Sequence, residues 1–411
     1  MGRLLDAGSI PAASTIKVID RIHITYVFVF YRKGVFFMNY ILKQFDNDLL
    51  YFSMENTNDG LQVHITSFNE NMKNHLPLDL EIDDKSLKRW LEKRTIPRNR
   101  AYVSNFLARL GLNEKDTKGI IEICQGLSLN DSYWVVKEDC KDLFADKNLY
   151  TNSFNTNIAS IAFTGYGSYT RSSFRSSPEF TTNGMLAKSW RRIKGKVILY
   201  KSGTEGFANS GLEPYSEFYA SQVAKTMELN HIDYDLSKWK GKLCSTCELF
   251  TSQNISFIPV GRLVKTGGIE AVIDYYKNLG EDYYQELIDM LVFDAVILNE
   301  DRHFGNFGLL VDSHTNKIID PAPIFDNGLS LLCYAMDSDF NDINTYVSTR
   351  LPATYQDFIG FVKPLMTSRQ KDKLRKLINF KFDRNTRYKL SNKRLKQLEK
   401  IIQERVILLL E

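Results

Sequence analysis

Three polar residues in the C-terminal half of the chain have types and an order suited to phosphoryl transfer. Asp301 and Asn306 share a polar segment behind a long apolar stretch, and Asp326 follows a short apolar segment ahead of Gly328. Transfer from ATP needs one carboxylate that orients the attacking hydroxyl and accepts its proton, and two oxygen ligands that hold Mg²⁺ against the phosphates. Kinases place a catalytic aspartate and a metal-binding asparagine at the spacing of Asp301 and Asn306, and Asp326 suits the second metal position. The alternative is that each residue caps a turn, since Asp and Asn are common in loops.

A cation for the phosphates is predicted at the end of an upstream strand. Residues 196–201 form a buried-strand pattern that ends in Lys201, and residues 213–227 form a helical pattern that carries Glu217. A strand lysine paired with a glutamate on the next helix is the kinase arrangement, so we predict that this pair binds ATP. The nearby alternatives are Lys194, Lys196 and Glu213.

The string Asn-x-Asp-Arg-His-x-x-Asn over residues 299–306, followed by Asp-x-Gly after a short hairpin, resembles the HipA-like kinases. These are bacterial serine/threonine kinases with a protein-kinase-like fold. The Asp-Arg-His-x-x-Asn part also occurs in phosphatidylinositol kinases, which are distantly similar. The resemblance is specific over residues 187–332, looser from Met38, and absent from residues 1–37.

The resemblance implies a role for each residue of the segment. Asp301 would be the catalytic base, and Asn306 and Asp326 would bind the metal, with ATP and Mg²⁺ as cofactors. His303 would shape the loop or contact phosphate, and a purely structural cap of the loop is the alternative reading.

The phosphate-covering loop departs from the common kinase pattern, because no Gly-x-Gly-x-x-Gly precedes the strand that ends in Lys201. Residues 183–188 (Asn-Gly-Met-Leu-Ala-Lys) occupy the place where HipA-like kinases have a short phosphate loop and its lysine, so the resemblance implies that Lys188 contacts phosphate. Members of the family can phosphorylate a serine in this loop and so switch themselves off. The hydroxyl residues in the corresponding region are Ser176, Ser177, Thr181 and Thr182.

The elements that must position these residues change in kind along the chain. Strands are expected at 49–52 and 61–65 with a turn at 56–60, followed by apolar helical stripes at 87–91 and 103–110. Residues 152–195 are rich in Ser, Thr, Gly and Asn and suit a flexible loop. Downstream we expect strands near Phe250 and at 256–264, a helix over 284–299, a hairpin of 309–311 with 317–319, and a final helix that begins at Ser391 or Asn392.

This order predicts an α+β, bilobal protein-kinase-like fold with a strand-rich N-lobe, a helical C-lobe and a small N-terminal accessory module. We expect the accessory module at 38–150, the N-lobe at 151–266 and the C-lobe at 267–411. The arginines of the module, namely Arg94, Arg98, Arg100 and Arg109, are interpreted as a solvated face, with contact to a phosphate or a partner as the alternative.

Residues 1–37 differ in sequence character from the rest of the chain, and we expect them to be a non-native or disordered leader. Residues 6–15 resemble the peptide obtained when the end of a transfer-RNA gene is translated. Our hypothesis is that translation begins at Met38.

Composition narrows the class of protein. The 411 residues are 43% hydrophobic and 25% charged, an ordinary balance for a globular protein. The net charge of +4 is small for this length and argues against a dedicated nucleic-acid binder, which would carry a concentrated basic face. The odd number of scattered cysteines indicates a reducing cytoplasm, and the isolated Cys244-x-x-Cys247 pair is interpreted as ordinary residues. Because the apolar runs near the N-terminus are too short for a membrane span, no membrane partner is expected.

Together these features predict an ATP-dependent serine/threonine protein kinase of HipA-like type that acts on a cytoplasmic protein. Autophosphorylation, a role as the toxin of a toxin–antitoxin system and a small DNA-binding antitoxin partner are further implications of the resemblance. The alternatives are a phosphatidylinositol-kinase-like lipid kinase and an inactive kinase-like module that binds nucleotide.

Overall fold

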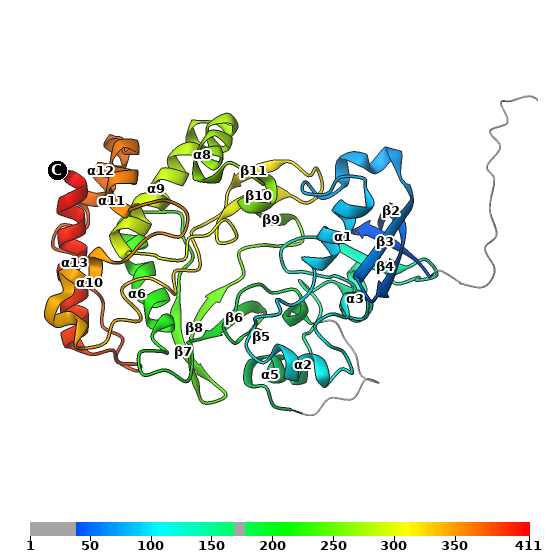
Figure 1. Cartoon of the computed structure of the whole chain (residues 1–411), viewed down its shortest axis with the longest axis horizontal. Helices are drawn as coiled ribbons and strands as arrows, with labels where there is room; N and C mark the ends of the chain where they lie inside the picture. The colour runs from blue at the N-terminus through cyan, green and yellow to red at the C-terminus, as the bar shows by residue number, and fades with distance from the viewer. Residues whose placement is uncertain (1–37, 168–176) are drawn as a thin grey trace, which may run out of the picture. The chain divides into compact units, whose positions relative to one another are not determined.

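The computed structural model describes residues 38–167 and 177–411, and Met38–Glu411 forms a compact unit. Within the described residues helices and strands are mixed, and the strands form three antiparallel sheets (Figure 1). This mixed class is the one that the sequence predicts. The division into two lobes and an accessory module stays a prediction.

The first sheet follows Met38 and has the strand order β3–β2–β1–β4. Its buried residues Leu50 and Phe52 share one core with Leu87 and Trp90 of helix α1. The predicted hairpin is present, because one strand ends at Thr57 and the next begins at Gly60, whose φ of +100° suits glycine. The strands are β1 (Asn39–Gln44), β2 (Asn47–Thr57), β3 (Gly60–Phe68) and β4 (Tyr133–Lys137).

Short helices lie in this part of the chain, and one of them, which packs against β5 (Lys188–Ile193) of the second sheet, corrects a prediction. The two predicted apolar stripes are the buried sides of α1 and α2. Residues 152–195 are not one long loop, because they include helix α5 and strand β5. Ile158, Ile161 and Phe163 are buried on α5, and burial at helical spacing outweighs the polar composition around it. The helices are α1 (Asp84–Glu92), α2 (Val103–Ala108), α3 (Thr117–Cys124), α4 (Phe144–Lys147) and α5 (Thr156–Thr164).

The arginines of this region do not form one solvated face. Arg98 and Arg109 are exposed, but Arg94 and Arg100 are each only 3% exposed. Arg94 forms an ion pair with Asp131 at 2.6 Å, and Arg100 binds backbone carbonyls. The prediction is wrong for these two residues because partners distant in the chain satisfy their charged groups.

The second sheet has the order β5–β6–β8–β7 and packs against helix α6. The predicted strand and helix that carry Lys201 and Glu217 are both present. The β5–β6 register places Lys188 opposite Lys201. The elements are β5 (Lys188–Ile193), β6 (Lys196–Ser202), α6 (Glu213–Thr226), β7 (Asp235–Trp239) and β8 (Lys242–Glu248).

The third sheet has the order β11–β10–β9 and contains the predicted hairpin, β10 (Gly308–Asp312) with β11 (Ile318–Pro321). The strand predicted over 256–264 is too long. β9 (Ile255–Pro259) ends at a proline, which has no N–H to continue a ladder, and α7 (Val260–Leu263) follows. Phe250 lies outside the strands and packs on Phe257 and Phe325.

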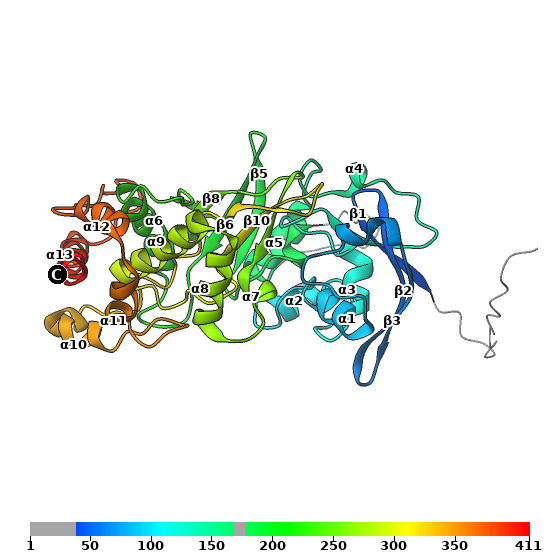
Figure 2. The ribbon, with the colours of Figure 1, turned by 90° about the horizontal axis from the view of Figure 1, so that it is seen from above.

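The C-terminal half supplies the largest core. Helix α9 is buried along most of its length and lies between α8 and α13 (Figure 2). The helices are α8 (Gly268–Leu279), α9 (Glu281–Ile297), α10 (Ile343–Ser348), α11 (Phe358–Val362), α12 (Ser368–Arg375) and α13 (Asn392–Leu410), the last preceded by the predicted Ser391. Among the described residues, no helix combines the length and the apolar character that a membrane crossing requires.

Candidate active site

Lys201 lies at the centre of the site, between two carboxylates from different parts of the chain. Its Nζ donates to Oε1 of Glu217 at 2.7 Å and also to Oδ1 of Asp326. Glu217 is fully buried and Lys201 is 7% exposed. Burial alone would lower the pKa of Lys201, but the charges of Asp326 and Glu217 raise it above its usual range. The lysine therefore stays charged in this position.

The alternatives to this pair lie elsewhere. Lys196 pairs with Glu248 at 2.6 Å on the surface, and Lys194 occupies an exposed turn between β5 and β6. Oε1 of Glu213 accepts hydrogen bonds from the Thr204 N–H and from the Tyr334 hydroxyl rather than from Lys201. Of the lysines and glutamates considered for this pair, Lys201 and Glu217 are the two that meet among the described residues.

The segment that carries Asp326 is held by backbone and side-chain contacts. Asp326 has a φ of +56°, a left-handed conformation that aspartate tolerates better than most residues. Its N–H donates to the Tyr234 hydroxyl at 3.1 Å, and the next N–H, of Asn327, donates to Oε2 of Glu217 at 2.7 Å. Although burial would raise the pKa of Asp326, the charges of Lys201 and Lys188 lower it, so the carboxylate stays ionised.

The loop that carries Asp301 and Asn306 follows α9 and is closed on itself. Nδ2 of Asn306 donates to the Asp301 carbonyl at 3.0 Å, which leaves the amide oxygen of Asn306 for another partner. Burial raises the pKa of the Asp301 carboxyl, and the nearby charge of Asp326 adds to the shift, whereas His303 and Lys201 oppose it. The loop thus combines an amide oxygen with a carboxyl group of raised basicity.

Arg302 holds this loop through buried hydrogen bonds, and its side chain is 1% exposed. Its guanidinium binds Asp294 of α9 through two bonds, Nε to Oδ2 at 2.9 Å and Nη2 to Oδ1 at 3.0 Å. It also donates to the Asn306 carbonyl at 3.0 Å and to Oδ1 of Asn327 at 2.6 Å. One buried cation therefore ties the Asp301 loop to the Asp326 segment.

His303 is exposed at the outer side of the loop. Its Nδ1 accepts a hydrogen bond from the Gly305 N–H at 3.0 Å, and a Cβ on Gly305 would lie 2.7 Å from the imidazole ring. This geometry is that of a loop cap. A contact of His303 with phosphate stays a prediction.

Lys188 and the preceding loop form the opposite side of the site. Its Nζ donates to the Asn183 carbonyl at 2.8 Å and would clash with a Cβ on Gly184, where φ is +93°. Burial lowers the pKa of Lys188 to about 7, and the charges of Arg100 and Lys201 add to the effect. The positive φ and the proximity of the lysine both favour glycine at residue 184.

Arg100 reaches this loop from the region before α2. Its Nε donates to the Gly184 carbonyl at 2.6 Å, and its Nη2 donates to the carbonyls of Asn183, at 3.1 Å, and Thr182. The Ala101 N–H adds a bond of 2.8 Å to the Met185 carbonyl. Within the described part of the chain, Nη1 of Arg100 is buried without a hydrogen-bond partner.

The hydroxyl residues proposed for self-modification are largely enclosed. Ser176 lies outside the described residues. Ser177 is buried and donates to Glu179, Thr181 is buried against the Leu127 carbonyl at 2.8 Å, and Thr182 donates to the Pro178 carbonyl at 2.7 Å. Phosphorylation of Ser177 or Thr181 would require this segment to move.

The donor set fits Mg²⁺ bound together with phosphate. Asp326 and Asn306 offer a carboxylate and an amide oxygen, both hard ligands of the kind Mg²⁺ prefers. Among the described residues, no cluster of three or more His, Cys, Asp or Glu side chains could hold a metal by itself. An ion at this site would therefore complete its coordination with phosphate oxygens and water.

The sequence interpretation assigned no function to Arg302 or Tyr234, and it placed Arg100 on a solvated face, with contact to a phosphate or a partner as the alternative. Arg302 belongs to the quoted motif, so its place in that string was a usable signal, but its ion pair with Asp294 links residues on a helix and a loop. Arg100 and Tyr234 lie far from the motif in sequence and carry no local signal. Only the folded chain brings them to the site.

No family model matches the sequence. A curated relative is the serine/threonine-protein kinase CtkA of Helicobacter pylori (strain J99 / ATCC 700824), which is 26% identical over 154 residues, or 32% of this chain and 47% of CtkA. The chain thus matches about half the length of this relative.

Two solved structures are similar in shape. The crystal structure of the proinflammatory kinase CtkA of Helicobacter pylori gives a TM-score of 0.46 at 18% identity, over 56% of this chain and 91% of CtkA. HipA of Shewanella oneidensis MR-1, in a complex with HipB and operator DNA, gives a TM-score of 0.51 at 12% identity, over 89% of this chain and 96% of HipA. The chain is thus similar in sequence to a curated kinase and similar in fold to HipA. These findings confirm the resemblance to HipA-like kinases that the motif predicts.

Proposed function

We propose that this chain is an ATP-dependent kinase of HipA-like type that phosphorylates serine or threonine hydroxyls of a cytoplasmic protein. The observation that carries the proposal is the contact of Lys201 with both Glu217 and Asp326. A strand lysine held by a helix glutamate, beside a metal-binding aspartate, is how protein kinases position nucleotide phosphates. The similarity to CtkA supports the same activity.

In the proposed reaction the acceptor hydroxyl oxygen forms a bond to the γ-phosphorus, and the bond from that phosphorus to the β-phosphate oxygen breaks. Asp301 accepts the hydroxyl proton. Its raised pKa favours this role, because a general base works best when its pKa lies near the working pH. Lys201 and Lys188 orient the phosphates. Asn306 and Asp326 would hold Mg²⁺, which when bound neutralises charge on the phosphate oxygens.

The decisive experiment is transfer of labelled γ-phosphate from Mg²⁺-ATP by the purified protein, with and without host lysate. We expect Asp301→Asn to lower turnover by roughly 10²–10⁴-fold, the scale for loss of a general base, while nucleotide binding is kept. Label on lysate proteins would identify targets, and label on the chain itself would be mapped to Ser176, Ser177, Thr181 or Thr182 by mass spectrometry.

Two results would contradict the proposal. Nucleotide binding without label on any protein would favour the inactive binding module. Label that appears only on phosphatidylinositol in added vesicles would favour the lipid kinase.

We also propose a toxin role with a small DNA-binding partner, on the strength of the fold shared with HipA, which was solved with HipB and operator DNA. Induced expression should then arrest growth, and Asp301→Asn should not. Normal growth with an active enzyme would remove the toxin role and leave the kinase activity intact.

A further inference from the structure

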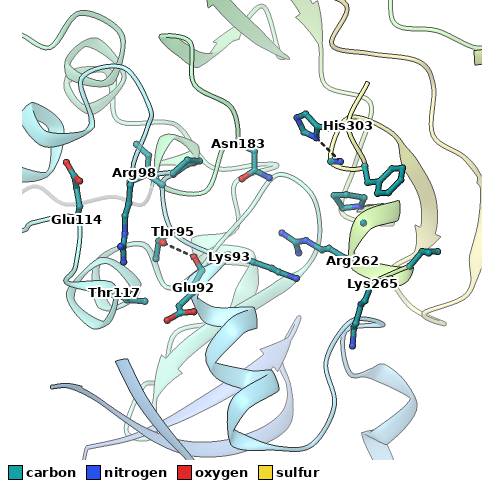
Figure 3. Close-up of a pocket in the computed structure, with 17 residues that line it drawn as sticks. Glu92, Lys93, Thr95, Arg98, Glu114, Thr117, Asn183, Arg262, Lys265 and His303 are labelled. Carbon is teal, nitrogen blue, oxygen red and sulfur yellow. Dashed lines mark hydrogen bonds between the residues drawn. The ribbon is translucent and has the colours of Figure 1, made fainter. Parts of the chain in front are cut away.

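A cleft with mixed polar and apolar walls is lined in part by residues 303–305 of the loop that carries Asp301 (Figure 3). Its volume is ≈ 700 Å³, within the range of ligand-binding sites. Its walls come from the end of α1 with the residues that follow, from α7 with its flanks, and from residues 303–305. Figure 2 shows α7 beside α1–α3, so segments far apart in sequence meet here.

The cleft borders the candidate site, but the residues that surround Lys201 do not line it. Lys201, Glu217 and Asp326 do not line it, whereas His303 and Asn183 do. His303 follows the candidate base Asp301 by two residues, and Asn183 belongs to the loop held by Lys188. An acceptor segment in the cleft would lie next to both loops of the site.

The charge of the cleft is mainly positive. Four lining side chains are cationic, Lys93, Arg98, Arg262 and Lys265, and two are acidic, Glu92 and Glu114. Figure 3 shows Lys93 and Arg262 extending toward each other from opposite walls. These facing cations lie 3.7 Å and 3.9 Å from the same buried carboxylate, that of Asp79, so one anion serves two cations.

The remaining cations are more available. Lys265 pairs with Glu81 at 2.9 Å, but both side chains are about half exposed or more, and such a pair is readily exchanged. Arg98 is exposed and forms no ion pair or hydrogen bond with another side chain among the described residues. Burial lowers the pKa of Lys93, Asp79 opposes this shift, and the neighbouring cations Arg262, Arg89 and Lys265 add to it.

We infer that this cleft binds the acceptor protein through acidic side chains that flank the phosphorylated hydroxyl. The inference rests on the proposed kinase function and adds a substrate class to it. A protein segment is favoured over nucleic acid because the walls also carry Glu92 and Glu114, which would repel a continuous phosphate backbone.

The test measures binding separately from catalysis. Short fluorescein-labelled peptides with one serine flanked by Glu, Gln or Lys are titrated with the full chain, Mg²⁺ and a non-hydrolysable ATP analogue, and the anisotropy is followed. We expect the Glu peptide to bind most tightly and the Lys peptide most weakly. Arg98→Glu should weaken the Glu peptide by roughly tenfold, because it replaces attraction by repulsion, and leave nucleotide affinity unchanged.

Arg109→Glu is the matched control, since Arg109 is also exposed in the same region but does not line the cleft. Lys265→Gln provides a second cleft variant, for which a smaller loss is expected. Equal affinity of the three peptides, or equal effects of Arg98→Glu and Arg109→Glu, would overturn the inference.

Other outcomes separate this inference from the proposed function. Binding of the Glu peptide that depends on Arg98, without phosphate transfer to any acceptor, would support the cleft and contradict the kinase. Transfer that is indifferent to the flanking charge would support the kinase and overturn the cleft. Binding of a labelled single-stranded RNA that depends on Arg98, with no peptide binding, would also overturn it.

Discussion

Two buried arginines hold the two loops of the site, and their partners differ in kind. Arg302 binds a carboxylate, Asp294, whose charge raises the pKa of the arginine despite burial. Arg100 binds only backbone carbonyls, and burial lowers its pKa to about 10. The cation that anchors the Asp301 loop is thus paired with a buried carboxylate, whereas the cation that anchors the Lys188 loop contacts neutral acceptors. Loss of Arg302 would therefore leave a buried charge without its partner, whereas loss of Arg100 would leave only neutral carbonyls without a donor.

The largest expected effect is on stability and comes from breaking the buried ion pair of Arg302 with Asp294. Arg302→Met would leave the Asp294 carboxylate buried without its cation, and loss of one member of a buried pair costs ~3–5 kcal/mol in the free energy of unfolding. Urea denaturation would measure this loss. The double variant Arg302→Met with Asp294→Leu should recover much of the stability, because no charge is then left alone. A single variant as stable as the natural chain would contradict the comparison.

The next effect is at Asp326, whose pKa is lowered, despite burial, by the nearby cations Lys201, Lys188 and Arg302. Asp326→Ala should weaken Mg²⁺-nucleotide binding by roughly 10- to 100-fold, the scale of a lost interaction with a charged group. Calorimetric titration would measure the affinity, with Asp326→Asn as the control that retains an oxygen ligand. Unchanged affinity in the alanine variant would contradict the metal role.

A smaller effect is expected at the loop that Arg100 holds through backbone carbonyls. Arg100→Gln removes the hold on the carbonyls of residues 182–184, and because these acceptors are neutral the fold should survive better than after Arg302→Met. Nucleotide affinity should fall by roughly tenfold, whereas Arg98→Gln, an exposed neighbour, should leave it unchanged. If Arg100→Gln unfolds the chain as readily as Arg302→Met, the distinction between the loops fails.

The smallest effect concerns pH. Lys188 has an ordinary pKa of 10.5 that is lowered to about 7, so it is charged below this value and neutral above it. If it contacts phosphate, nucleotide affinity should decrease several-fold between about pH 6 and pH 8, and Lys188→Met should lack this part of the pH dependence. Comparison of the two proteins cancels the titration of the nucleotide itself. Parallel pH profiles would exclude a charged role for Lys188 in this range.

Local patterns in the sequence were sufficient for the parts of the site that lie within a few residues of one another. The Asp301–Asn306 loop, the hairpin behind it and the strand that ends at Lys201 depend on short-range periodicity and turn chemistry, and each is present in the structure. The catalytic and metal roles of these residues stay predictions.

Tertiary structure decided what depends on distant segments. It brought Arg100 to residues 182–184 and buried α5 inside a stretch that reads as polar loop, and it formed the contact of Lys201 with Glu217 that the sequence favoured over Glu213. It also formed the cationic cleft from segments that lie far apart in the sequence and share no sequence pattern. The physical reason is that backbone propensity and apolar spacing act locally, whereas the pairing of buried charges depends on which surfaces the hydrophobic cores bring together.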